Sequence, residues 1–427
     1  MDRMSSPGPA RARVAVISLH TSPFDQPGTG DSGGMNVYVK AVAERLAEHE
    51  IGIDVFTRCA GRGVPEVEQT GPLTRVIQVP AGPCAAVAKI DLPALLPAFA
   101  GRVVTTGNGR RPLYDLVHSH YWLSGSVGRT ARAKWAVPLV ASFHTLGRVK
   151  NLALSEGEDP EPQERLTGEE DTIRAADRIL APTPVEAAHL ENLYEAPAGR
   201  IRVVPPGVDT GLFRPRHRDQ AKNALGLAGH RVVMFLGRLQ RFKGPDVAIR
   251  AVGDAFRRDP SGTEDVVLVV VGGPSGPDGP AEASRLRRLA RELRLEDRVR
   301  FLPPRPHHEL PEVYAAADVL VMPSRSESFG LVALEAQACG VPVVASAVGG
   351  LLTVVDDGGS GFLVPGNDPA GFADRLLAVL SDPALADRLS SGALAHAARF
   401  TWEDTVAELL GVYGELVPAL APVVAID

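Results

Sequence analysis

Cysteine is scarce in this chain, with three residues in 427 and no C-x-x-C spacing. This argues against a disulfide framework or a cysteine-rich zinc site and fits a reducing compartment. Positive charge is not in excess either, since the formal net charge is −6, so a broad nucleic-acid-binding surface is not expected. The longest apolar run, VVLVVV at 266–271, is too short to cross a bilayer. We therefore expect a cytoplasmic protein with no nucleic-acid or membrane partner.

The beginning of the chain lacks the apolar segment that marks a secretory signal, and we expect residues 1–12 to form a flexible tail. Over 13–208, runs of β-branched apolar residues alternate with segments of helical period, and the pattern restarts over 209–401. This alternation predicts an α/β fold of two doubly wound, Rossmann-like domains that face a central cleft. A last helix over 402–420 is expected to pack back on the first domain.

Glycine is concentrated in one stretch, GTGDSGGMNVYV at 28–39, between a predicted strand and a predicted helix. Backbone amides without side chains and the positive end of a helix suit an anion. The spacing is not G-x-G-x-x-G, and the second predicted strand ends in Thr-Arg at 57–58 rather than in an acid, so a dinucleotide fingerprint is a poor match. His20 ends the first strand and Gly33-Gly34 begin the helix, which favours a phosphate-facing site over a flexible surface loop.

Two charged patterns stand at predicted strand ends in the second domain. In GRLQRFKGP, Arg238 and Lys243 are spaced to clasp two neighbouring phosphates, with solvated surface charges as the alternative. In SRSESFGLVALEAQACGVPVVAS, Glu327 and Glu335 stand eight positions apart, slightly over two turns of about 3.6 residues each. A carboxylate there can accept hydrogen bonds from a sugar diol, whereas either acid alone could be a cap or a surface charge.

Histidine recurs at predicted strand ends of the first domain, at His20, His118, His120 and His144. The surrounding sequence does not supply the carboxylates that support metal-bound histidines, and a single histidine at such a position is as often a packed or capping residue. His144 with Thr145 fits a polar lining of the cleft better. The chain has no G-x-S-x-G elbow and no P-loop.

Together, GRLQRFKGP and SESFGLVALEAQACGVPVVAS resemble the retaining GT-B glycosyltransferases of family GT4. More closely, VAVISLHTSPFDQPGTGDSGGMNVYV, DLVHSHYWLSG, HTLGRVKN and GRLQRFKGP…GGPSGP look like the D-inositol-3-phosphate glycosyltransferases of actinobacterial mycothiol synthesis, over 13–415. HTSP…QPGTGDSGGMN also resembles sucrose-phosphate synthases. The resemblance implies a cytoplasmic homodimer that transfers N-acetylglucosamine from UDP-N-acetylglucosamine to 1D-myo-inositol 3-phosphate, the first step of mycothiol biosynthesis.

The resemblance also implies roles for individual residues. Arg238 and Lys243 would neutralise the donor diphosphate as its charge grows during bond breaking. Glu335 would hold the ribose hydroxyls and Glu327 the transferred sugar. The other positions that match donor contacts are Gln26, Pro27, Gly34 and, beside the uracil, Arg305. The implied catalytic residues are His144, Arg238, Lys243 and Glu327.

The acceptor carries its own phosphate, so the resemblance implies a second anion site in the first domain. The positions that match this phosphate site are Lys89, Tyr121, Thr145 and Arg165. Those that match contacts to the inositol ring are His20, Asp31, Ser32, Gly33, Gly34, Met35 and Asn36. An acidic protein would thus bind two anionic substrates through a few placed cations.

A magnesium ion is also implied by the family, held by main-chain carbonyls at Tyr314, Ala315, Ala317 and Val341. The sequence has no carboxylate cluster that supports this ion independently. Fixed cations at the diphosphate would make a metal unnecessary for the reaction, so we expect no strictly required cofactor.

Two alternatives stay open at this point. A GT4 enzyme with another phosphorylated acceptor, such as fructose 6-phosphate, would use the same acceptor-phosphate residue types. A sugar-nucleotide epimerase or a non-catalytic nucleotide-binding module could share the architecture, but it would not need those residues in the first domain. The inositol-phosphate transferase is the preferred interpretation.

Overall fold

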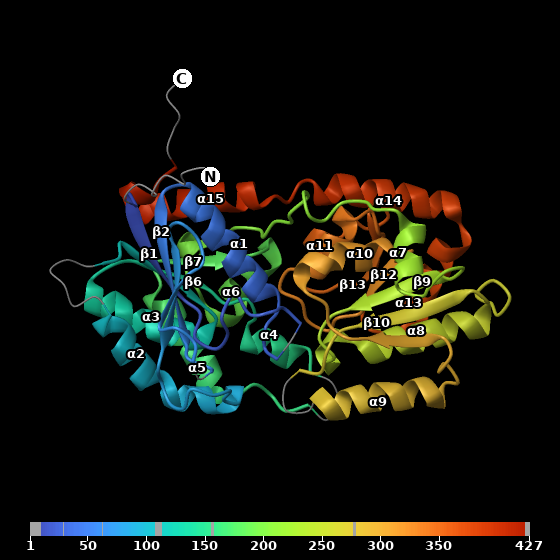
Figure 1. Cartoon of the computed structure of the whole chain (residues 1–427), viewed down its shortest axis with the longest axis horizontal. Helices are drawn as coiled ribbons and strands as arrows, with labels where there is room; N and C mark the ends of the chain where they lie inside the picture. The colour runs from blue at the N-terminus through green and yellow to red at the C-terminus, as the bar shows by residue number, and fades with distance from the viewer. Residues whose placement is uncertain are drawn as a thin grey trace, which may run out of the picture.

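The computed structural model describes residues 10–28, 30–61, 63–106, 113–154, 158–275 and 279–422. Figure 1 shows two β-sheets, one in each half of the chain, with helices packed on both faces of each. The predicted α/β fold with two doubly wound units is confirmed. In this part of the chain, no helix combines the length and apolar character needed to span a membrane.

The first sheet comes from the N-terminal half. Its strands are β1 (Ala12–Ile17), β2 (Ile51–Arg58), β3 (Val67–Gln69), β4 (Thr74–Val79), β5 (Leu116–His120), β6 (Leu139–Ser142), β7 (Arg178–Ala181) and β8 (Ile201–Val203). Their order is β3-β4-β2-β1-β5-β6-β7-β8, and neighbours are parallel except β3 with β4. The exposed edge strand β3 was not predicted, because none of its residues is buried.

The second sheet has six strands. They are β9 (Arg231–Leu236), β10 (Val266–Val271), β11 (Val299–Leu302), β12 (Val319–Met322), β13 (Val343–Ser346) and β14 (Gly361–Val364), and their order is β11-β10-β9-β12-β13-β14. Every residue of β10 is buried, as expected for a continuous apolar run in a parallel strand that is covered on both faces.

Helices connect the strands. In the first half these are α1 (Gly34–Glu48), α2 (Leu96–Thr105), α3 (Trp122–Trp135), α4 (Gly147–Leu152), α5 (Gln163–Ala175) and α6 (Pro184–Tyr194), with the 3-10 helices η1 (Lys89–Leu95) and η2 (Ala198–Arg200). Helix α1 buries Val39, Val42 and Leu46, as its apolar spacing predicts.

In the second half the helices are α7 (Arg218–Ala224), α8 (Pro245–Arg258), α9 (Gly279–Glu292), α10 (Leu310–Ala315), α11 (Leu331–Ala338), α12 (Leu351–Val354), α13 (Pro369–Ser381), α14 (Pro383–Ala397) and α15 (Trp402–Leu416), with η3 (Arg241–Lys243), η4 (His307–Glu309) and η5 (Pro418–Leu420). Proline at the first helical position and a side-chain cap begin both α13 and α14, because proline lacks only an amide that would be unpaired there.

The chain crosses between the two halves twice, and the crossings lie side by side. Val208 bridges to Thr401, and a Cβ on Gly207 would lie 2.2 Å from the Thr401 carbonyl carbon. After the second crossing α15 runs beside α1 (Figure 1) and shares a core cluster with β1 and α1 through residues such as Leu409. The crossing backbones therefore depend on glycine at 207.

The N-terminal boundary differs slightly from the expectation. Strand β1 begins at Ala12, inside the expected tail. The Arg11 amide donates to the Glu50 carbonyl, and its guanidinium donates to the carbonyls of His49 and Ala421. Residues 1–9 of the expected tail lie outside the described residues.

Candidate active site

A cavity of about 890 Å³ lies between the two domains. It opens at the carboxyl ends of central strands of both sheets, the edge at which doubly wound α/β proteins bind ligands. Of the predicted site residues, those that line it are His20, Asp31, Gly33, Gly34, Met35, Lys89, Tyr121, His144, Thr145, Arg165, Arg238, Lys243 and Glu327.

The glycine stretch lies where the first domain comes close to the second. A Cβ on Gly33 would lie 3.7 Å from Arg238 Nε, and one on Gly34 would lie 3.4 Å from Leu331 Cδ1. Both neighbours belong to the second domain. A larger side chain at either position would fill the space between the domains, so these glycines keep the first turn of α1 open toward Arg238 and the cavity.

Two polar residues of the same stretch turn away from the cavity. The Ser32 hydroxyl hydrogen-bonds the Thr21 hydroxyl, and the Asn36 amide group donates to the Thr21 hydroxyl and the Ser22 carbonyl. The Asn36 side chain also accepts from the Gly33 amide. Ser32 and Asn36 are both buried. Their side chains fix the loop and do not line the cavity, and the ring contacts expected of Ser32 and Asn36 stay a prediction.

The second domain contributes two cations to one wall. Arg238 follows β9, and Lys243 ends η3 with its Nζ 2.6 Å from Glu327 Oε2. Burial lowers the pKa of Arg238 from its ordinary value, while the carboxylates of Asp31 and Glu327 act in the opposite direction. Arg238 and Lys243 thus form one cationic wall of the cavity, and their contact with a donor diphosphate stays a prediction.

The two predicted acids have different surroundings. Glu327 lines the cavity, whereas Glu335 on α11 is buried outside its lining. The Tyr314 hydroxyl, at 2.8 Å, and His307 Nε2, at 2.7 Å, hold the two Glu335 oxygens. Burial alone would lower the pKa of His307, but the charge and hydrogen bond of Glu335 raise it above the ordinary value. A carboxylate offers about four lone-pair positions, so Glu335 can still accept further hydrogen bonds.

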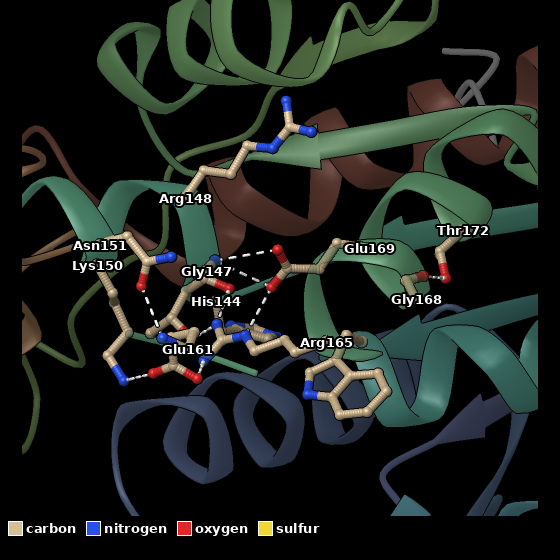
Figure 2. Close-up of polar contacts among 12 residues, drawn as sticks. His144, Gly147, Arg148, Lys150, Asn151, Glu161, Arg165, Gly168, Glu169 and Thr172 are labelled. Carbon is tan, nitrogen blue, oxygen red and sulfur yellow. Dashed lines mark hydrogen bonds and ion pairs between the residues drawn. The ribbon is translucent and has the colours of Figure 1, made fainter. Parts of the chain in front are cut away.

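The four predicted acceptor-phosphate residues converge on the opposite wall. Arg165 Nε donates to Glu169 at 2.8 Å (Figure 2). Its Nη2 donates to the carbonyl and hydroxyl of Thr145 at 3.0 Å. Lys89 Nζ lies 4.2 Å and the Arg165 guanidinium 5.1 Å from the centre of the Tyr121 ring. Glu169 fixes Arg165 from behind, which leaves its remaining nitrogen, Nη1, directed toward other groups.

That nitrogen meets a carboxylate that the sequence did not reveal. Arg165 Nη1 lies 2.8 Å from Glu161 Oε2, and the other Glu161 oxygen pairs with Lys150 (Figure 2). Burial alone would raise the pKa of Glu161, but Arg165 and Lys150 hold it below the ordinary value. Lys150 and Glu161 also line the cavity. A lysine at the end of a short helix and an acid in a Pro-rich loop carry no sequence signal for this pairing.

Three of the histidines pack together in the first domain, where the ring centroids of His118 and His120 are 4.1 Å apart. His118 Nδ1 lies 2.7 Å from the Tyr413 hydroxyl, its Nε2 lies 2.9 Å from the Ser142 hydroxyl, and His120 Nδ1 lies 2.9 Å from His144 Nε2. Burial lowers the pKa of His118 and of His144 to about 3. These two imidazoles are therefore neutral near pH 7, and His118 and His120 are packed residues.

His144 and Tyr121 share an unusual backbone conformation. Their φ angles are 59° and 75°, in the left-handed region that residues with a side chain seldom adopt. Both line the cavity. The His144 carbonyl accepts a hydrogen bond from the Ser328 hydroxyl of the second domain at 2.5 Å. Backbone strain of this kind concentrates at functional sites, and here it turns both side chains to the cleft.

The carbonyl set implied for magnesium fits a cation poorly. Its residues Tyr314, Ala315, Ala317 and Val341 are all buried, and the Tyr314 carbonyl accepts a hydrogen bond from the Ala317 amide at 2.9 Å. Among the residues that the structure describes, no group of three or more His, Cys, Asp or Glu side chains could hold a metal ion. Magnesium prefers carboxylate and water oxygens, which this set of main-chain carbonyls does not supply.

Besides Glu335, three predicted donor residues lie outside the cavity lining: Gln26, Pro27 and Arg305. Gln26 and Pro27 belong to the loop before the glycines, and a Cβ on Gly28 in that loop would lie 3.5 Å from Pro304. Arg305, beside Pro304, pairs with Glu309 at 3.7 Å. This places the loop next to the PPRP segment that was expected to lie near the uracil.

Comparisons with known proteins agree with this geometry. Residues 33–207 match the model of the glycosyl transferase 4-like domain, and residues 217–396 match that of glycosyl transferases group 1. A D-inositol 3-phosphate glycosyltransferase from Acidothermus cellulolyticus is 51% identical over 94% of this chain and 90% of its own length. The chain belongs to the D-inositol 3-phosphate glycosyltransferase family. It is therefore a GT4 hexosyltransferase, and the alternatives of an epimerase and of a non-catalytic module are set aside.

Solved structures similar to this glycosyltransferase have the GT-B fold. The sucrose-phosphate synthase from Thermosynechococcus elongatus superposes with a TM-score of 0.87 at 34% identity, over 96% of this chain and 100% of that chain. Anabaena HepE in complex with UDP-glucose gives a TM-score of 0.75 at 22% identity, over 95% and 100%. The predicted GT-B architecture is thus confirmed.

Glu161→Gln keeps the shape of the side chain and removes its negative charge. Because Glu169 and Thr145 still hold Arg165, we expect inorganic phosphate to bind this variant about fivefold more tightly, or ~1 kcal/mol. Titration calorimetry at constant ionic strength measures the change. Glu164→Gln, an exposed acid that lines the same cavity, is the matched control. Weaker phosphate binding by Glu161→Gln would show that Glu161 is needed to hold Arg165.

His307→Gln tests the pairing with Glu335 through its pH dependence. The folded-state pKa of His307 is raised above 6.5, so the pair stabilises the fold below about pH 6.5 and loses this contribution as the pH rises through the folded pKa. We expect the variant to lose about 1 kcal/mol of unfolding free energy near pH 6 and less near pH 9. Urea unfolding measures the loss, with exposed His308→Gln as control. A loss independent of pH contradicts the pairing.

Proposed function

We propose that this enzyme transfers N-acetylglucosamine from UDP-N-acetylglucosamine to 1D-myo-inositol 3-phosphate with retention of configuration, the first step of mycothiol biosynthesis. The observation that carries the proposal is that cations line two sides of one cavity. Arg238 and Lys243 lie on one side, and Lys89 and Arg165 lie on the other. A reaction between two phosphate-bearing substrates needs two such walls. A cytoplasmic location and a homodimer are part of the same proposal.

The donor wall supplies fixed positive charge where negative charge develops. As the glycosidic bond breaks, the diphosphate takes up charge, and Arg238 and Lys243 stabilise it without reorganising. Glu327 already orients Lys243 through their 2.6 Å contact, and it would hold the transferred sugar. Glu335, fixed by Tyr314 and His307, would use its remaining lone pairs for the ribose hydroxyls. A UDP-glucose complex of the structural relative HepE supports a uridine nucleotide as donor.

The acceptor wall supplies a second anion site. Lys89, Tyr121, Thr145 and Arg165 lie together on the cavity lining with His20 and Asp31, and the first four would bind one phosphate group. His144 lies between the walls with a neutral imidazole. A neutral ring can position a sugar hydroxyl by a hydrogen bond, while the leaving phosphate takes the proton of the attacking acceptor hydroxyl. The names of the curated relatives support inositol 3-phosphate as this acceptor.

A second candidate acceptor is fructose 6-phosphate. The structural relative that supports it is the sucrose-phosphate synthase, which is 34% identical with a TM-score of 0.87. The same phosphate-binding residue types would serve both acceptors, so only an assay separates them.

The direct test is UDP release from UDP-N-acetylglucosamine with three acceptors: inositol 3-phosphate, free inositol and fructose 6-phosphate. We expect turnover with inositol 3-phosphate at least about tenfold above free inositol, since the phosphate contributes charge-assisted hydrogen bonds. We expect it to exceed turnover with fructose 6-phosphate as well, since the curated relatives are named for inositol 3-phosphate. NMR of the product reports the anomeric configuration. Faster turnover with fructose 6-phosphate, or an inverted product, contradicts the proposal.

Lys89→Ala separates the two walls. Loss of a charge-assisted contact to the acceptor phosphate should raise the acceptor KM by more than about tenfold, equivalent to about 1.5–3 kcal/mol. UDP affinity should change by less than about twofold, because Lys89 lies on the acceptor wall. Steady-state kinetics and calorimetry with UDP measure the two effects, and exposed Lys134→Ala is the matched control. Equal weakening of UDP binding would contradict the assignment.

A further inference from the structure

Two of the three cysteines meet beside the acceptor wall, although 25 positions separate them. Strands β2 and β4 run parallel and end together, with Arg58 opposite Val79. Cys59 directly follows β2 and its amide donates to the Val79 carbonyl. Cys84 lies in the loop after β4. The Cys59 and Cys84 sulfurs are 2.6 Å apart, and neither residue is in a disulfide.

Arg58 holds the two cysteine segments together. Its guanidinium donates to the carbonyls of Cys59 and Pro83 at 2.8 Å and of Ala85 at 2.7 Å. The acceptors flank both cysteines, so one buried side chain fixes the backbone on each side of the sulfur pair. The sulfurs would need to approach by only about 0.6 Å to reach a disulfide bond length of about 2.05 Å.

The Cys84 segment leads directly into the acceptor wall. Five residues after Cys84, Lys89 begins η1 and lies over the Tyr121 ring. Val87 and Ala88 line the cavity together with Lys89. A covalent link at Cys84 would therefore anchor the connection that carries Lys89 to the end of β2.

We propose that Cys59 and Cys84 are a redox modification site, at which a low-molecular-weight disulfide oxidises the pair and tethers the loop that carries Lys89. The Cys84 thiolate attacks one sulfur of the small disulfide and releases its first thiol. The Cys59 thiolate then attacks the Cys84 sulfur and releases the second thiol. Two protein thiols are oxidised to one disulfide, the small disulfide is reduced to two thiols, and the two cysteine protons go to the released thiolates.

The exposure of the two sulfurs sets this order. Cys84 is partly exposed and Cys59 is 8% exposed, so the outer sulfur meets the oxidant and the inner one resolves the mixed disulfide. Cys339 serves as an internal reference. It is buried in the second domain, and burial, with the nearby Glu335 carboxylate, raises the pKa of its thiol to about 12. Cys339 should remain reduced under conditions that oxidise Cys59 and Cys84 to a disulfide.

Treatment of the full-length protein with glutathione disulfide tests the site. We expect the titratable thiols of the unfolded product to fall from three to one and the intact mass to fall by two hydrogen atoms. Peptide mapping should place the bond between Cys59 and Cys84. Cys59→Ser should instead accumulate a glutathione adduct on Cys84, and Cys84→Ser should remain unmodified at Cys59. Retention of three thiols, or a bond that includes Cys339, would overturn the proposal.

The effect on the acceptor wall is measured separately and rests on the proposed function. We expect the oxidised enzyme to show an acceptor KM changed by at least about threefold, with the donor KM within about twofold and full reversal by dithiothreitol. Cys84→Ser, which cannot form the bond, should show no response to the oxidant. Unchanged acceptor kinetics in a protein whose Cys59–Cys84 disulfide has fully formed would overturn the tethering of Lys89. The thiol count needs no substrate, so failure of the proposed reaction and failure of the redox site are distinguishable.

Discussion

The compensation of buried positive charge organises the whole cleft. A cation removed from water is unfavourable unless a partner of opposite charge and good hydrogen-bonding geometry accompanies it. Lys243 has Glu327, and Arg165 has Glu169 behind it and Glu161 in front. Glu161 also neutralises Lys150.

These carboxylates are of two kinds. Some hold the fold together, and others lie where a substrate phosphate would compete with them for the cation. Glu169 belongs to the first kind because it also accepts from the Gly147 amide and the Tyr194 hydroxyl. Glu161 belongs to the second because its partners both line the cavity.

A second constraint is the distance between the domains. The glycine stretch allows the backbone of the first domain to approach Arg238, and the Ser275 hydroxyl of the second domain donates to the Gly30 carbonyl at 2.6 Å. Ser328 makes a similar contact to His144. Each contact joins a main-chain carbonyl of the first domain to a hydroxyl of the second. These two contacts are polar, as at domain interfaces that move, whereas Gly207 fixes the crossing point of the chain.

The sequence predicted the parts whose signal is local. Buried parallel strands such as β10 read as continuous apolar runs, and cations after β9 were recognised at a ligand-binding edge. Strand β3 was not predicted because its exposed residues show no alternation of apolar and polar side chains. Strand β14 was not predicted because it is short and begins with glycine. Within the site, the sequence could not predict the direction in which the side chains point. The sequence cannot show that Ser32 turns inward, and no spacing rule connects Glu161 with Lys150 or Cys59 with Cys84, because tertiary packing alone brings these pairs together.

The distribution of charge across the cavity agrees with the proposed chemistry. Cations occupy both walls, but His144 between them is kept neutral by burial and is bonded to another neutral imidazole, His120. Because His144 is neutral and the cations lie on the two walls, electrostatic stabilisation acts mainly where the substrate phosphates would bind. In the proposed reaction, the leaving diphosphate held by Arg238 and Lys243 would take the proton of the acceptor hydroxyl, as retention through attack from the leaving-group side requires.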